Sequence, residues 1–166
     1  TKISNTLAHK LCTNLGIKLK ILPIHELFDL NLNLLYENIF QNTTWDITEE
    51  NLQSRIRSNI LMAISNKMNY MLLSTGNKSE MSMGYSTIYG DLAGGFAPLK
   101  DITKSMVYKL CISYNRANPK NKIPNKIITR EPSAELKHDQ KDSDTLPSYE
   151  ILDEVLNLYV EKFGTV

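Results

Sequence analysis

The stretch of residues 74–97 constrains the fold most, because it places turn residues, small residues and a few charges between two apolar-periodic segments. Residues 70–73 before it form a short apolar run typical of a buried strand, and turn chemistry ends that run. Helix-forming residues follow the turn. This order of strand, tight loop and helix start predicts the rim of a ligand site, because ligands bind outside the carboxyl ends of strands in open α/β sheets. Thr75 and Glu80 would lie on that rim.

The spacing of apolar residues predicts helices along most of the remaining chain. Caps for these helices are predicted at Ser4, Asp46 or Thr48, Thr103 and Ser148. Gly16 stands where the first helix should end, and residues 27–40 form the second helical segment. The third helix is expected to bury a stripe of Leu52, Ile56, Ile60, Ala63 and Ile64.

Two further segments have strand character. Residues 17–22 alternate between polar and apolar and end at Pro23, and residues 127–129 form either a short strand or a packed turn. Helices and strands in this order predict an α/β fold with a parallel sheet flanked by helices. The chain opens on a helix, so we expect the first strand and its phosphate loop to be missing from it.

Composition narrows the class of function. The 166 residues fit one domain, and 19 Lys and Arg against 18 Asp and Glu give a net charge of +1, which argues against a nucleic-acid or membrane role. Cys12 and Cys111 form no C-x-x-C pair and favour a reduced, cytoplasmic protein in which they fill apolar space. His9, His25 and His138 lack metal-ligand spacing. Residues 130–147 are charged and poor in apolar side chains, and we expect a mobile surface loop there.

Five strings of the sequence, taken in order, resemble the synthetase domain of NAD synthetases, and most closely the glutamine-dependent branch. They are ENLQSRIR (residues 50–57), STGNKSE (74–80), YGDLAGGFAPLKD (89–101), EPSAEL (131–136) and LPSYEILD (146–153). The resemblance covers essentially the whole chain. It implies an adenine nucleotide alpha hydrolase-like (Rossmann-like) fold and a homodimer.

The chemistry implied by the resemblance has two steps. ATP adenylates the nicotinate carboxylate of deamido-NAD and releases pyrophosphate, and ammonia then displaces AMP to give NAD. The mixed anhydride makes sense because a free carboxylate is a poor acceptor for an amine. The ammonia would come from glutamine through a glutaminase domain outside this chain, and Mg²⁺ would accompany ATP.

The resemblance also assigns roles to individual residues. Thr75, Lys104 and Ser133 match positions that contact ATP, and Lys104 would offset charge on pyrophosphate during catalysis. Asn51, Arg55 and Glu80 match positions that contact deamido-NAD, and Glu80 also matches a magnesium ligand. Asn51 and Arg55 lie one helical turn apart, which is also the pattern of an ordinary solvated helix face.

Other polar and soft side chains have simpler interpretations. Lys78 and Asp91 suit loop structure and Asp101 suits a turn or cap, whereas Met81, Met83 and Tyr85 suit packing better than a cofactor site.

The chain also departs from the family pattern. The serine-glycine-glycine phosphate loop and the basic C-terminal tail of the family do not occur in it. We therefore expect a partial NAD synthetase domain over residues 1–166, truncated at both ends and inactive in isolation. The alternative is a non-catalytic remnant that keeps the dimerisation helices and weak dinucleotide binding.

Overall fold

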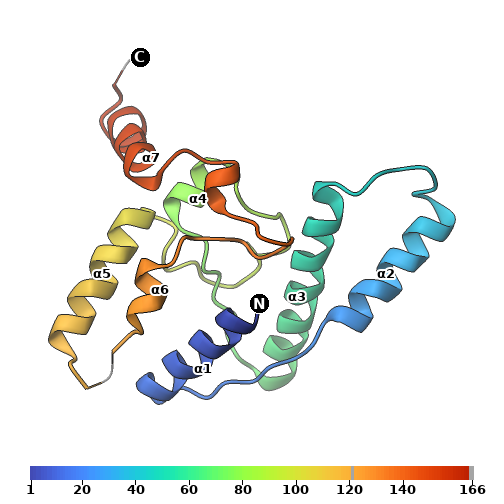
Figure 1. Ribbon diagram of the computed structural model, residues 1–166, viewed down its shortest axis with the longest axis horizontal. Coiled ribbons are helices and arrows are strands. Elements are labelled where there is room, and N and C mark those ends of the chain that lie inside the picture. The colour runs from blue at the N-terminus through green and yellow to red at the C-terminus, as the bar shows by residue number, and fades with distance from the viewer. Residues whose placement is uncertain (121, 165–166) are drawn as a thin grey trace. The chain divides into compact units, whose positions relative to one another are not determined.

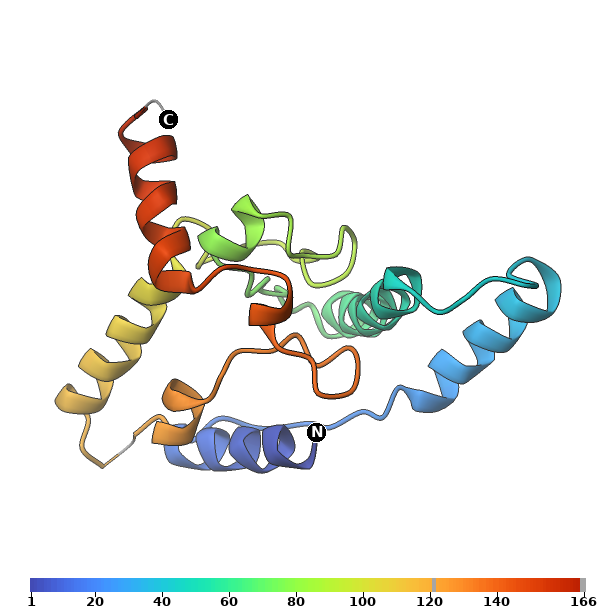
Figure 2. The ribbon, with the colours of Figure 1, turned by 45° about the horizontal axis from the view of Figure 1, so that its top comes forward.

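The computed structural model describes residues 1–120 and 122–164, which form two compact units. One unit comprises residues 22–101, and the other comprises residues 1–21 together with the segment from residue 102 onward. We describe each unit by itself. Figures 1 and 2 show the helices of both units, which make up most of the regular structure.

The unit of residues 22–101 begins with a helical hairpin, α2 (His25–Asn38) and α3 (Ile47–Met68). The predicted cap at Asp46 is confirmed, because its side chain accepts a hydrogen bond from Thr48 N while Glu49 binds the Asp46 N–H at 2.8 Å. Tyr36 ties the two helices together by donating its hydroxyl hydrogen to Glu49 Oε1 at 2.6 Å. Phe28 and Trp45 add an edge-to-face contact with ring centroids 6.0 Å apart.

After α3 the chain passes through an extended segment into the short helix α4 (Lys78–Ser82), which Asn77 caps. The strand predicted at residues 70–73 is reduced to one parallel bridge between Leu73 and Phe96. Ser74 N donates to Phe96 O at 2.9 Å and Gly95 N donates to Leu72 O at 2.8 Å. The glycine-rich segment therefore runs parallel to the end of this segment, which is the one trace of a parallel sheet among the described residues.

The other unit contains α1 (Lys2–Leu15), α5 (Lys104–Ala117), α6 (Asn125–Thr129), the 3-10 turn η1 (Asp142–Asp144), α7 (Tyr149–Leu156) and the π-helical turn η2 (Asn157–Glu161). Both ribbon views place α6 beside α1. Helix α5 packs against both α6 and α7. The predicted caps at Gly16 and Thr103 are confirmed, since Gly16 adopts φ 67° and Thr103 Oγ1 accepts from Met106 N.

Three local predictions for this unit are wrong. The cap of α1 is Thr1, whose Oγ1 accepts from Ser4 N, and Ser4 itself lies inside the helix. Residues 17–22 are not a strand, because a strand needs a hydrogen-bonded neighbour and the described chain offers residues 18–22 no such partner. Residues 127–129 belong to α6. Pro124 is the N-cap of this helix, and its carbonyl oxygen accepts a hydrogen bond from Ile127 N.

The buried side chains differ in kind between the units. Among the described residues, the buried hydrophobic side chains all come from the segment around α7. They are Leu146, Tyr149, Leu152 and Leu156. In α3 the buried residues are instead Glu49, Glu50, Ser54 and Ser58, and the stripe predicted from Leu52 to Ile64 is not buried. Leu52, Ile56 and Ile60 are half-buried, and Ala63 and Ile64 are exposed. Across residues 1–120 and 122–164, no helix has both the length and the hydrophobicity to cross a membrane.

Candidate functional site

The loop of residues 87–91 is anchored to one face of α3 by polar side chains. Asn51 Oδ1 accepts a hydrogen bond from the Thr87 hydroxyl at 2.7 Å, and Arg55 Nε donates to Ile88 O at 3.2 Å. Both residues were predicted to contact deamido-NAD, and the structure places them one turn apart on α3, where both bond to the loop that follows α4. Each therefore has a structural role as well as the one that the resemblance assigns to it.

These bonds leave N–H groups of both side chains available as hydrogen-bond donors. Within the described residues, neither the Asn51 amide nitrogen nor the terminal nitrogens of Arg55 have a hydrogen-bond partner. Arg55 is exposed, and its Nε bond fixes the plane of the guanidinium. A fixed guanidinium with two open amino groups can hold a carboxylate or a phosphate in a fork.

Two serines complete the polar face of α3, and neither was predicted from the sequence. Ser54 Oγ accepts from Asp91 N at 3.0 Å, and Ser58 Oγ donates to Tyr89 O. Both serines are buried, and they alternate with Asn51 and Arg55 at the i, i+3, i+4, i+7 spacing of one helix face. That polar stripe is the signal that could have found them.

Glycine is required at two points where the loop approaches its neighbours. A Cβ at Gly90 would lie 2.8 Å from Thr87 Cβ and 2.9 Å from Ser54 Cβ. A Cβ at Gly94 would lie 2.8 Å from the backbone nitrogen of Ser74 and 2.9 Å from Leu72 O. Real Cβ atoms do not approach other atoms so closely, so the YGDLAGG string is needed for the loop to reach α3 and residues 72–74.

Thr75 and Glu80 follow the parallel bridge in the chain, and their place on a ligand-site rim stays a prediction. Thr75 is exposed and follows Ser74 directly, one residue beyond the parallel bridge. Glu80 is half-buried, and its Oε2 accepts from Asn77 N at 3.2 Å while Glu80 N donates to Asn77 Oδ1. The Glu80 carboxylate therefore completes a capping box at the start of α4.

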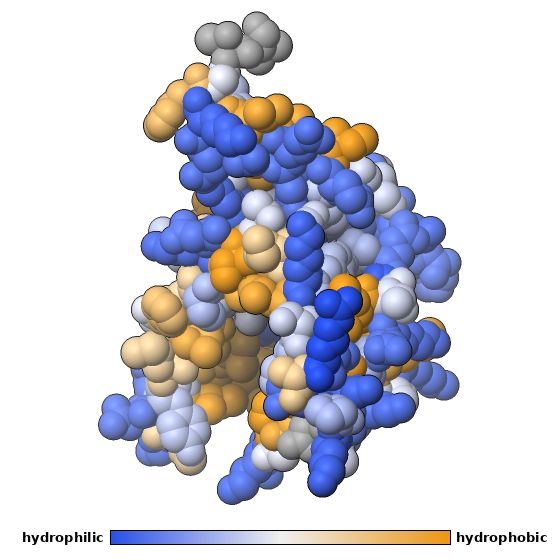
Figure 3. All heavy atoms as spheres, turned by 90° about the vertical axis from the view of Figure 1, so that its left-hand side faces the viewer, coloured by the Kyte–Doolittle hydropathy of each residue, from blue (hydrophilic) through white to orange (hydrophobic). Residues whose placement is uncertain are grey.

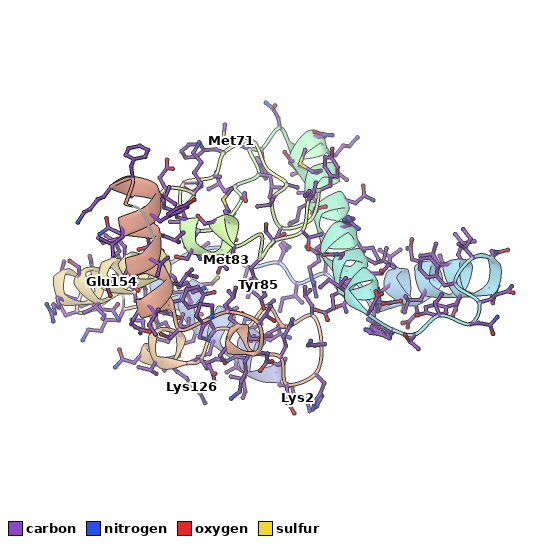
Figure 4. The ribbon with its side chains drawn as sticks, turned by 90° about the horizontal axis from the view of Figure 1, so that it is seen from above. Lys2, Met71, Met83, Tyr85, Lys126 and Glu154 are labelled. Atoms are coloured by element: carbon purple, nitrogen blue, oxygen red, sulfur yellow. The ribbon has the colours of Figure 1, made fainter. Side chains whose placement is uncertain are left out.

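Whether this part of the chain can hold Mg²⁺ depends on which side chains could act as its ligands. No three His, Cys, Asp or Glu side chains of the described chain form a group that could hold a metal ion. Mg²⁺ bound with a nucleotide needs only one or two carboxylates, because phosphates and water supply its other ligands. Glu80 alone is compatible with that kind of site. Met83 and Tyr85, which follow α4, are labelled in Figure 4.

Lys104 and Ser133, the other two predicted ATP contacts, line one pocket of the second unit. The pocket has a volume of about 430 Å³, and its walls come from α1, α5, α6 and the segment after α6. Its apolar lining consists of Leu7, Ala8, Leu11, Val107, Tyr108, Cys111, Ile127 and Ile128. Figure 3 views the side where α5 lies and shows hydrophobic side chains gathered around a hollow. An apolar pocket with a few placed polar groups is typical of a small-molecule site.

The polar groups of this pocket are held in defined positions. Lys104 is the first residue of α5, and its Nζ lies 5.3 Å from the centroid of the Tyr149 ring. Ser133 Oγ accepts from Glu135 N at 3.1 Å, which leaves the hydroxyl hydrogen to be donated elsewhere. The structure therefore brings Lys104 and Ser133 to the walls of the same pocket.

Glu135 is the strongly perturbed acid of the pocket. Burial acts to raise its pKa, but hydrogen bonds from Ser4, the Thr1 amino group and Arg130 outweigh burial and bring the pKa down to about 2. Arg130 Nη2 lies 2.7 Å from Glu135 Oε1, and Arg130 Nη1 donates to Ser4 Oγ at 2.6 Å. Burial raises the pKa of the Cys111 thiol, which favours the neutral form and fits its place in an apolar wall.

The chain matches a known protein family and is similar to several known proteins. A family model described as NAD synthase matches residues 1–165. The glutamine-dependent NAD(+) synthetase of Thermotoga maritima is 50% identical over 155 residues, and that of Aquifex aeolicus is 49% identical over 155 residues. Each match covers 93% of this chain and 27% of the relative. The chain therefore spans about a quarter of the length of these relatives.

Solved structures give the same result for the fold. The structure of glutamine-dependent NAD+ synthetase from Acinetobacter baumannii, in complex with ADP, matches with a TM-score of 0.76 and 39% identity over 98% of this chain and 28% of that one. NMN synthetase from Francisella tularensis matches with a TM-score of 0.80 and 26% identity over 100% of this chain and 63% of that one. These neighbours share the adenine nucleotide alpha hydrolase-like fold, so the broad fold prediction is confirmed although the predicted sheet is reduced to one bridge.

Proposed function

Because this chain belongs to the NAD synthase family, we propose that it supplies part of the site where ATP activates deamido-NAD for amidation. The observation that carries the proposal is that Lys104 and Ser133, two predicted ATP contacts far apart in sequence, line one pocket. An ammonium and a donating hydroxyl on an apolar wall suit a nucleotide, whose base is apolar and whose phosphates are anionic.

The reaction that we propose takes place in two steps. A carboxylate oxygen of deamido-NAD attacks the α-phosphorus of ATP, and the bond from that phosphorus to pyrophosphate breaks. Ammonia then attacks the carbonyl carbon of the adenylate, AMP leaves, and the amine loses a proton to give the amide of NAD. Negative charge builds on the leaving pyrophosphate in the first step, and the Lys104 ammonium would stabilise it.

The unit of residues 22–101 would bind the second substrate. Arg55 presents a guanidinium whose plane is fixed by its bond to Ile88 O, and such a group suits a carboxylate or a phosphate of deamido-NAD. The Asn51 amide would donate to the same molecule. Thr75 would contact ATP from the exposed end of the bridge segment. Glu80 would hold Mg²⁺, which would neutralise part of the phosphate charge when bound with ATP.

We propose a dinucleotide substrate over a mononucleotide because this chain has higher sequence identity to NAD synthetases than to an NMN synthetase. The NAD synthetases of Thermotoga maritima and Aquifex aeolicus are 49–50% identical to this chain and that of Acinetobacter baumannii is 39% identical, whereas the NMN synthetase is 26% identical. Since the chain spans about a quarter of those NAD synthetases, we propose that it binds nucleotide but does not release pyrophosphate by itself. Ammonia derived from glutamine, a homodimer and a cytoplasmic location stay predictions.

The test is a calorimetric titration of the chain with ATP and Mg²⁺. Lys104→Ala is expected to weaken binding at least tenfold, about 1.4 kcal/mol, because it removes the charge-assisted contact to phosphate. Lys126→Ala is the matched control, because Lys126 is exposed on α6 and is absent from the pocket lining. Equal affinities for the two variants would contradict the proposal. Binding by the chain with no turnover in any longer form of the protein would instead support the non-catalytic alternative.

A further inference from the structure

Lys104 is the first residue of α5, in the unit that carries the pocket, and its position at this helix end needs an explanation. A cation at the first residue of a helix is unfavourable, because the N-terminus of a helix carries a partial positive charge. Helix α5 has no acidic residue in its own first turn. The groups that hold this lysine in place must therefore come from another part of the unit.

Helix α7 supplies those groups. Tyr149 and Asp153 lie one turn apart on α7, and both are buried. The Tyr149 ring lies under the Lys104 ammonium, 5.3 Å from Nζ to the ring centroid, and Asp153 Oδ2 accepts from Ser105 N at 2.8 Å. One face of α7 thus provides a carboxylate for the N-terminus of α5 and an aromatic surface for its first side chain.

Asp142 extends this arrangement behind the ring. The Tyr149 hydroxyl donates to Asp142 Oδ2 at 2.7 Å, and Asp142 is only 3% exposed. Its other oxygen, Oδ1, has no hydrogen-bond partner among the described residues. A phenol that donates to a carboxylate becomes richer in electrons, and a richer ring attracts a cation more strongly.

The backbone of Asp142 is bonded to a residue that lines the same pocket as Lys104. Asp142 N donates to Pro132 O at 3.0 Å, and Pro132 and Ser133 both line the pocket with Lys104. One buried residue is therefore bonded through its side chain to the residue beneath Lys104 and through its main chain to the neighbour of Ser133.

We infer that Tyr149 and Asp142 are positioning residues, which aim the Lys104 ammonium into the pocket and set its distance from Ser133. An aromatic face orients a lysine and leaves its N–H groups able to donate to phosphate oxygens. This inference rests on the proposed function for the identity of the ligand, but the placement of Lys104 can be measured without any ligand.

The first test is a titration of the full chain with ATP and Mg²⁺. Tyr149→Leu is expected to weaken binding about fivefold, in the range of a cation–π contact. Tyr149→Phe and Asp142→Asn keep the ring and should weaken binding about twofold, because they remove the hydroxyl bond or the charge behind it. Tyr159→Leu, an exposed tyrosine on η2, is the matched control and should leave affinity unchanged.

A double variant separates positioning from a general structural effect. In a Lys104→Met background, Tyr149→Phe should cost no further affinity, because the residue through which Tyr149 acts is gone. Losses that simply add would overturn the inference. Tyr149→Phe preserves the buried ring volume, so this cycle stays measurable even if Tyr149→Leu does not fold.

The second test uses no nucleotide. In an NMR spectrum of the free chain, the side-chain protons nearest to Lys104 Nζ should be shifted upfield by the Tyr149 ring, and Tyr149→Leu should abolish that shift. Absence of the shift in the wild-type chain would overturn the inference. If the shift is present but Lys104→Ala does not affect ATP binding, the proposed function fails and the placement of Lys104 by Tyr149 stands.

Discussion

The two units hold their predicted substrate-binding residues in different ways. In the unit of residues 22–101, Asn51 and Arg55 are fixed by hydrogen bonds to a loop more than 30 residues away in the sequence. In the other unit, Lys104 is fixed by the packing of α7 on α5 and by the buried Tyr149 ring. The first arrangement depends on polar groups and close backbone approach, and the second depends on buried apolar surface.

This difference indicates which substitutions each unit should tolerate least. Buried polar groups cost free energy when one partner is removed, and a loop held by them tolerates little change in shape. A helix packed on another helix has more ways to adjust. Substitutions on the loop of residues 87–91 should therefore have larger effects on stability than conservative substitutions around the pocket.

The largest expected effect comes from Gly90→Ala. The new methyl group would lie within 3 Å of the side chains of Ser54 and Thr87, so the loop must move away from α3. We expect a loss of about 2–3 kcal/mol in the free energy of unfolding, as for an overpacked site. Urea denaturation measures it, with Gly76→Ala as the control, because a Cβ there meets only ordinary contacts at 3.5 Å or more.

If Gly90→Ala and Gly76→Ala had the same stability, the close approach of the loop to α3 would be wrong.

A smaller effect is expected from Ser54→Ala. The change leaves the Asp91 N–H without its acceptor at 3.0 Å, and a buried unsatisfied donor costs about 1–3 kcal/mol. Thermal denaturation of Ser113→Ala provides the control, because Ser113 is an exposed serine in the middle of α5 and the same exchange tests helix propensity alone. Comparable melting temperatures for both variants would show that the serine face of α3 does not hold the loop.

The last effect concerns Glu135 and is seen in its titration. The folded pKa of about 2 lies below the ordinary value of 4.5, so the stabilisation is present above about pH 4.5 and is lost as the pH falls toward 2. Stability should therefore not change through this group between pH 7 and 5. Arg130→Ala removes the guanidinium whose Nη2 lies 2.7 Å from Glu135 Oε1. The pKa of Glu135 should therefore rise, and NMR of the side-chain carboxyl can follow that change. An ordinary pKa in the unaltered chain would contradict the ion pair.

Local features could be predicted from the sequence because they depend on neighbouring residues. The caps at Asp46 and Thr103 and the left-handed Gly16 follow from residue type and position. Thr1 and Ser4 show the limit of this method, since both residue types cap helices and only the hydrogen bond to Ser4 N decides between them.

Long-range features could not be predicted in this way. The alternation in residues 17–22 suits a strand, but a strand depends on a neighbour that the segment itself does not encode. Ser54 and Ser58 look like ordinary surface serines until the loop of residues 87–91 is placed over them. The resemblance identified Lys104 and Ser133, yet only the fold of residues 102–164 brings them to one pocket.

The proposed function requires that the pocket lined by Lys104 and Ser133 binds a nucleotide. A crystal structure of the chain with Mg²⁺ and a non-hydrolysable ATP analogue tests it most directly. We expect phosphate oxygens at about 3 Å from Lys104 Nζ and from Ser133 Oγ. A nucleotide bound away from both side chains would contradict the account.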